Sequence, residues 1–154
     1  MNKRNIWFFS CLIVTFSTIL LLATGSFLLT VAIDNSNTVP LGSFIIWAGI
    51  ISFPHTIYWG VKELRRPTKK FNKILAVFLK IIITLAILWL PLAYLLAGNL
   101  SFSFSEKESF QGGQNAMKWF WRLSYGIEIG ALLIIVIYCA SLLFIKKKAT
   151  VNNL

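Results

Sequence analysis

Four long runs of apolar residues, separated by short polar segments, dominate the pattern of this chain. An α-helix needs about 20 residues to cross the hydrocarbon core of a membrane, and each run reaches that length. The first run is also far longer than the ~7–15 apolar residues of a signal peptide, so we expect it to remain as a helix. The pattern predicts an all-α fold in which one domain, residues 1–154, forms a bundle of four transmembrane helices. These helices are expected at approximately residues 6–33, 41–61, 74–97 and 119–145.

The composition favours lipid over water as the surrounding medium. The chain is 57% hydrophobic and only 13% charged, whereas soluble domains carry about 25% charged residues. Its net charge of +10 is compatible with nucleic-acid binding, but most of the cations lie directly beside the apolar runs. In those places they anchor helices and face anionic headgroups. The predicted partner is therefore the lipid bilayer, and nucleic acid is not expected.

The cations also predict the orientation of the chain. Eleven of the fifteen Lys and Arg residues lie at the N-terminus, in the connector 62–73 and at residues 146–148. With four spans, all three places lie on one side of the membrane, and Lys107, Lys118 and Arg122 lie on the other. Because cytoplasmic loops carry the excess of Lys and Arg, both termini are predicted to be cytoplasmic. The small size and the inward lysines favour the bacterial inner membrane.

Two sets of small residues at four-residue spacing predict helix-packing faces. Residues at this spacing share one face of a helix, and small side chains there let two backbones approach closely. The alternative is chance, because small residues are common in membrane helices. The first set is Ala48, Ser52, Thr56 and Gly60, and the second is Gly126 and Gly130.

Glu128 is the one acidic residue inside an apolar run. An ionised carboxylate is costly in lipid, and such residues usually face the interior of a bundle or water. One interpretation is structural, with Glu128 hydrated near the outer surface or paired with Arg122 or Lys118. The other interpretation gives it a role in handling a substrate, an ion or a proton, with Tyr125 close by on the same helix.

His55 is the only histidine of the chain and follows Pro54 within the second run. At 1.5 Å per helical residue, it lies near the cytoplasmic edge, whereas Glu128 lies near the opposite edge. A direct pair between the two is therefore not expected. The simpler interpretation is a hydrogen-bonded packing histidine beside a kink, and the alternative is a functional side chain.

Motifs that would indicate catalysis are missing from the sequence. We find no nucleophile motif, no metal-ligand spacing and no glycine-rich phosphate loop, so neither an enzyme nor a cofactor or metal is expected. The predicted function is that of a non-catalytic accessory, regulatory or protective component of a membrane process, either as a homo-oligomer or within a larger membrane complex. The alternative is a small oligomeric transporter or channel with Glu128 as the coupling residue.

Overall fold

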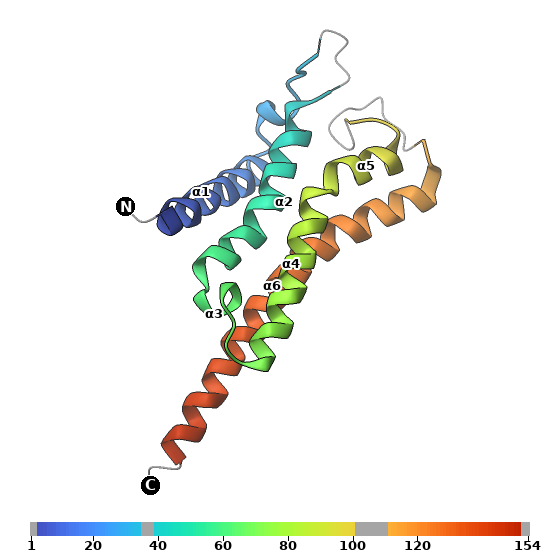
Figure 1. Ribbon diagram of the computed structural model, residues 1–154. Coiled ribbons are helices and arrows are strands. Elements are labelled where there is room, and N and C mark those ends of the chain that lie inside the picture. Colours follow the sequence, from blue (N-terminus) through green and yellow to red (C-terminus); the bar gives the residue numbers. More distant parts are fainter. Residues whose placement is uncertain (1–2, 35–38, 101–110, 152–154) are drawn as a thin grey trace.

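The described part of the chain folds into helices and the segments that connect them (Figure 1). The computed structural model describes residues 3–34, 39–100 and 111–151, with side chains described up to residue 143. Within these ranges the regular structure is helical, apart from a single bridge between Ala32 and Pro40. The predicted all-α fold is confirmed. The helices are α1 Lys3–Ala23, the 3-10 helix η1 Phe27–Leu29, α2 Leu41–Gly60, α3 Lys62–Arg65, α4 Lys70–Ile87, α5 Trp89–Ala97 and α6 Gly113–Val151.

Among the described residues, three helices are long and apolar enough to cross a membrane: α1, α2 and the Gly113–Leu143 part of α6. The pair α4 and α5 meets the same criterion only when its two members are taken together, and the axes of that pair differ by 52°. Large apolar side chains are widely exposed, for example Phe16 and Leu143. Several long apolar helices with apolar outer surfaces are the pattern of a membrane protein.

The first predicted helix, 6–33, is wrong at its carboxyl end, because α1 stops at Ala23. Gly25 has a φ of +58°, a left-handed conformation that glycine adopts without a steric penalty. The Ser26 N–H donates to the Leu21 carbonyl at 3.1 Å, and the Gly25 N–H donates to the Leu22 carbonyl at 3.2 Å. This pair of hydrogen bonds closes a helix end, and the chain then continues into η1.

The third predicted helix, 74–97, is broken into α4 and α5 at Leu88. Pro91 has no N–H, so the Ile87 carbonyl cannot form its usual helical bond to residue 91, and an axis usually bends at such a place. Trp47 of α2 compensates for the loss, because its Nε1–H lies 3.2 Å from both the Ala86 and Ile87 carbonyls. The indole therefore ties α2 to the break.

The remaining boundaries differ because hydropathy marks the part of a helix that suits lipid, not the end of the helix itself. The predicted helix 41–61 agrees with α2 to within one residue. The predicted helix 119–145 lies inside the longer α6, whose backbone continues into the polar residues at both ends. In the same way, α4 starts at Lys70 rather than at residue 74.

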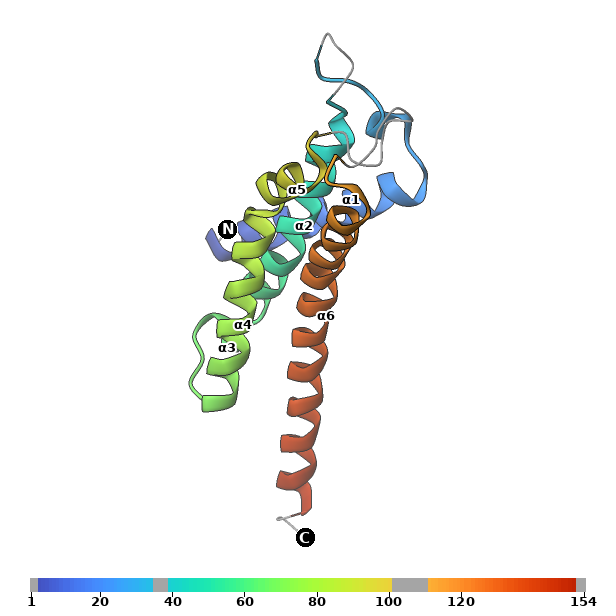
Figure 2. The ribbon, with the colours of Figure 1, turned by 90° about the vertical axis from the view of Figure 1, so that its right-hand side faces the viewer.

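The packed centre of the molecule lies between α2, the α4–α5 pair and α6 (Figures 1 and 2). In this centre the Trp89 indole of α5 donates to Ser124 Oγ of α6 at 2.8 Å, and Ser124 donates in turn to the Phe120 carbonyl. Helix α1 instead runs obliquely across α2 at the side of the molecule (Figure 1). Over the whole of α1, the buried side chains are those of Thr15 and Thr18.

Candidate functional site

Helix α1 is held to α2 by small and hydroxylated side chains. Thr15 Oγ1 and Ser52 Oγ lie 2.8 Å apart and form a buried hydrogen bond between the helices. A Cβ added at Gly49 would lie 2.5 Å from Cγ2 of Thr18, and one added at Gly60 would lie 2.8 Å from the Phe8 ring. Small residues of α2 therefore let α1 approach closely along much of its length.

The predicted packing face of α2 lies largely on this interface. Ser52 and Gly60 contact α1 as described above, and Ala48 lines a shallow groove against α1 although its own side chain is exposed. Thr56 Oγ1 donates to the Ser52 carbonyl of its own helix at 2.9 Å. Gly49 is the glycine of α2 at which an added Cβ would lie nearest to α1, and it is not part of the predicted four-residue pattern.

The two glycines of α6 have different surroundings. Gly130 faces α4, where a Cβ would lie 2.9 Å from Ile82 Cδ1. Gly126 is exposed, and an added Cβ would meet no described atom within 4 Å. Gly126 therefore does not pack against another helix among the described residues, and its role in packing stays a prediction. The reason is helical geometry, because the buried stripe of α6 follows residues 120, 124, 127, 131 and 134 and leaves residue 126 outside it.

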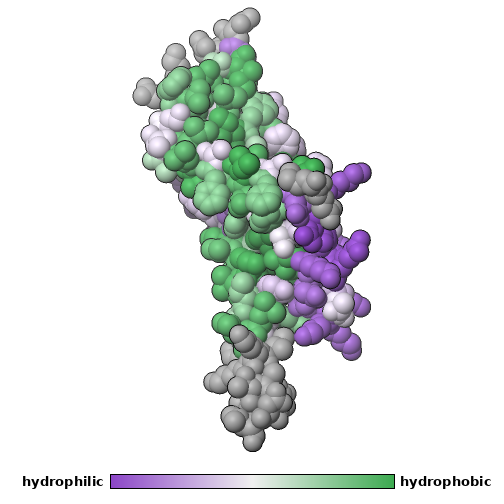
Figure 3. All heavy atoms as spheres, turned by 90° about the vertical axis from the view of Figure 1, so that its left-hand side faces the viewer, coloured by the Kyte–Doolittle hydropathy of each residue, from purple (hydrophilic) through white to green (hydrophobic). Residues whose placement is uncertain are grey.

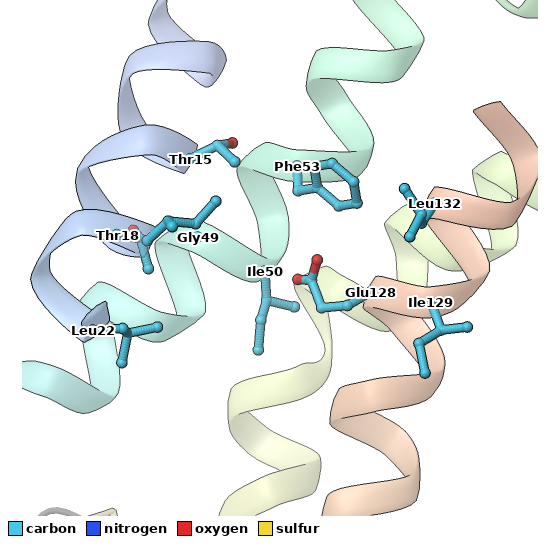
Figure 4. Close-up of a pocket in the computed structure, with 10 residues that line it drawn as sticks. Thr15, Thr18, Leu22, Gly49, Ile50, Phe53, Glu128, Ile129 and Leu132 are labelled. Carbon is cyan, nitrogen blue, oxygen red and sulfur yellow. The ribbon is translucent and has the colours of Figure 1, made fainter. Parts of the chain in front are cut away.

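A cleft of about 410 Å³ opens between α1, α2 and α6, and Glu128 lies in it. Most of its lining is apolar, and Figure 4 shows the Glu128 carboxylate pointing towards Ile50 and Phe53 of α2. Thr15 and Thr18 line the α1 side of the same cleft. The same cleft is therefore lined by Glu128 of α6 and by two threonines of α1 that lie more than a hundred residues away in the sequence.

Glu128 is half-buried, and no hydrogen bond or ion pair joins it to another residue in the part of the chain that the structure describes. Arg122, one of the alternative partners named for Glu128, does not pair with it, and the Arg122 guanidinium lies over the Trp119 ring at 5.2 Å. Tyr125 is exposed and stacks on Trp121, with 5.4 Å between the ring centroids. Neither Arg122 nor Tyr125 lines the cleft.

His55 also lies outside the cleft. Its Nδ1 lies 2.8 Å from the Ile51 carbonyl one turn earlier in α2. A carbonyl oxygen can only accept, so Nδ1 carries the hydrogen in this contact. This contact therefore uses one ring nitrogen of His55 within α2 itself.

A second polar region combines arginines with aromatic rings at the end of α2. Arg4, Tyr58, Trp59, Arg65 and Arg66 line a hollow of about 480 Å³. The Arg65 guanidinium lies 5.6 Å from the centroid of the Trp59 ring and donates to the Trp59 carbonyl at 3.4 Å. Figure 3 shows hydrophilic side chains gathered along one edge of a broad hydrophobic face. Cations beside aromatic rings are typical of the boundary between lipid and water.

The described residues do not offer a metal site, since no three His, Cys, Asp or Glu side chains come together among them. The fold and its two polar regions define a helical protein suited to a lipid environment. No protein-family model, curated protein or solved structure matches this chain. Its function must therefore be argued from its own residues.

Proposed function

We propose that this protein is a non-catalytic accessory, regulatory or protective component of a membrane process in the bacterial inner membrane. The observation that carries the proposal is the use of interior polar groups as links between helices. Trp47 binds the carbonyls at the α4–α5 break, Trp89 binds Ser124, and Thr15 binds Ser52. Polar groups used in this way stabilise helix contacts and are not available for chemistry.

The proposed topology has four spans, with α4 and α5 forming one bent span, and both termini in the cytoplasm. The hollow around Trp59 supports this orientation, because it unites Arg4 at the start of α1 with Arg65 and Arg66 after α2. These cations come from two segments that the four-span arrangement places on the same side. An excess of arginine and lysine marks the cytoplasmic side.

Reporter fusions test this topology. A reporter that is active only in the periplasm should be active after Gln111 and inactive after Leu154, and a reporter active only in the cytoplasm should give the opposite result. The physical reason is the cost of moving the cationic segments across the membrane. Cytoplasmic activity at Gln111, or periplasmic activity at Leu154, would contradict the four-span proposal.

The exposed apolar surface supports association with other chains as part of the same proposal. Leu95 is 76% exposed and Phe16 is 66% exposed. Such side chains can face lipid or a neighbouring helix, so a homo-oligomer or a larger membrane complex is compatible with this surface.

A second candidate function, transport by a small oligomer with Glu128 as the coupling residue, is favoured by one observation. The Glu128 carboxylate lies in a cleft without a partner among the described residues, and unpaired acids within membrane helices often mark ion or proton pathways. The proposed accessory role does not need this charge. The two functions therefore differ in what happens when the charge is removed.

The variant Glu128→Gln separates the two functions, because it keeps the shape of the side chain and removes the charge. For the accessory role, we expect full growth complementation of a strain that lacks the gene, at normal membrane abundance of the variant. Loss of complementation at normal abundance would favour transport. Glu63→Gln is the matched control, since it makes the same charge change in α3, outside the cleft.

A further inference from the structure

We infer that the cleft between α1, α2 and α6 binds a lipophilic ammonium ion, that is, an apolar organic molecule that carries a protonated amine. The cleft volume of about 410 Å³ is in the range of pockets that hold small organic molecules. Apolar side chains such as Ile19, Leu22 and Leu132 line most of it. This inference goes beyond the accessory role and does not depend on it.

The hydroxyl groups of the cleft have no hydrogen left to donate to a ligand. Thr15 Oγ1 lies 2.9 Å from the Cys11 carbonyl and 2.8 Å from Ser52 Oγ, which itself lies 3.0 Å from the Gly49 carbonyl. Whichever hydroxyl donates to the other, the second donates to a carbonyl, so both hydrogens are used. Thr18 donates to the Ile45 carbonyl at 3.3 Å. Thr15 and Thr18 can therefore offer a ligand only their lone pairs.

In its ionised form, the Glu128 carboxylate completes a set of polar groups in the cleft lining that are all acceptors. An ionised carboxylate accepts hydrogen bonds only, and without a partner it is costly in a lipid environment. A protonated amine supplies both the missing charge and N–H donors, and such charge-assisted hydrogen bonds are among the strongest. Phe53 adds an aromatic ring beside Glu128 (Figure 4), and cations bind favourably to aromatic faces.

The acceptor groups of the cleft, together with its apolar walls, also disfavour other classes of ligand. An anion or a ligand whose polar atoms only accept would meet further acceptors and lose its own hydration without compensation. A purely apolar ligand would fit the walls but leave Glu128 without a partner. The combination of apolar walls with acceptors therefore selects for a cationic amphiphile.

Two sources could supply the ammonium group. One is a free lipophilic amine dissolved in the bilayer, and the other is the headgroup of an aminophospholipid. Glu128 lies about 14 Å from Trp119 along the axis of α6, at 1.5 Å per residue. Helices α1 and α6, which form the cleft together with α2, both carry exposed apolar side chains. Both sources offer the same chemistry to the cleft, and competition between them distinguishes them.

The test compares a matched pair of probes, 1-naphthylmethylamine and 1-naphthylmethanol, with the full chain in phosphatidylcholine nanodiscs. Binding to empty nanodiscs is subtracted. We expect the amine to bind at least about tenfold more tightly than the alcohol, a difference of about 1.4 kcal/mol. Glu128→Gln should abolish this preference, and Glu63→Gln should retain it. Equal binding of the two probes by the unmodified chain, or a preference that survives in Glu128→Gln, would overturn the inference.

A second variant tests the place of binding independently of the charge. Ile19 lines the cleft from α1 and is 57% exposed, so tryptophan at this position can fill the cleft without entering the packed centre. Ile19→Trp should weaken both probes alike, and unchanged binding of the amine would contradict the assigned site. Phosphatidylethanolamine added to the nanodiscs should compete with the amine if an aminolipid occupies the cleft. Without such competition, the ligand is a free amine.

Discussion

Replacing Gly49 by leucine is expected to separate α1 from α2, whereas the same change at Gly126 should leave the fold intact. A Cβ at position 49 would lie 2.5 Å from Cγ2 and 2.9 Å from Cβ of Thr18, and the rest of a leucine side chain cannot fit there. At position 126 an added Cβ meets no described atom within 4 Å. Both positions gain the same intrinsic helix propensity, so the difference between the two variants isolates the packing.

The expected cost at Gly49 is about 1–3 kcal/mol, the usual range for overpacking. We expect a clear loss of stability in the contact between α1 and α2, because the buried side chains of α1, Thr15 and Thr18, both lie at this interface. The midpoint of thermal unfolding in detergent, followed by tryptophan fluorescence, measures the effect. Equal midpoints for Gly49→Leu and Gly126→Leu would show that α1 does not depend on this contact.

The sequence predicted the class of fold well because the pattern of hydropathy shows which segments suit lipid, whatever contacts the helices then make with one another. It placed α2 to within one residue. The bend between α4 and α5 lies beside Pro91, and a proline inside a helix usually bends the axis. The hydropathy pattern failed at the end of α1 because apolar residues continue after the turn at Gly25. The triplet Thr24-Gly25-Ser26 was the available signal, since glycine followed by a polar residue commonly ends a helix.

The site was predictable only in part. Glu128 was recognisable as an acid inside an apolar run, but the pairing of helices that forms its cleft depends on tertiary packing. Thr15 and Thr18 left a signal that was overlooked, because two hydroxyls three residues apart form a polar stripe on an apolar helix. Arg122 was only one of the alternative partners for Glu128, and Trp119, three residues before Arg122 on α6, binds its guanidinium instead.

The hydrogen bond of Trp47 to the α4–α5 break should be energetically coupled to Pro91. Trp47→Phe keeps an aromatic ring and removes the N–H, which leaves the Ile87 carbonyl without the donor that replaces its helical partner. Lipid offers no donor to replace the indole N–H, so the unsatisfied carbonyl is costly, and we expect a loss of about 1–3 kcal/mol. Pro91→Ala restores an N–H at position 91, and this N–H can bond the Ile87 carbonyl within the helix.

A double-mutant cycle measures this coupling by reversible unfolding in detergent. Trp47→Phe should be clearly less destabilising in the Pro91→Ala chain than in the unmodified chain, with a coupling energy of about 1 kcal/mol, within the range for groups in one hydrogen-bond network. The matched control pairs Trp47→Phe with Leu95→Ala, an exposed position of α5, and should be additive. Additivity in both cycles would mean that Pro91, rather than the indole of Trp47, maintains the bend. A coupling confined to Pro91 would identify Trp47 as the side chain that makes a broken helix stable in lipid.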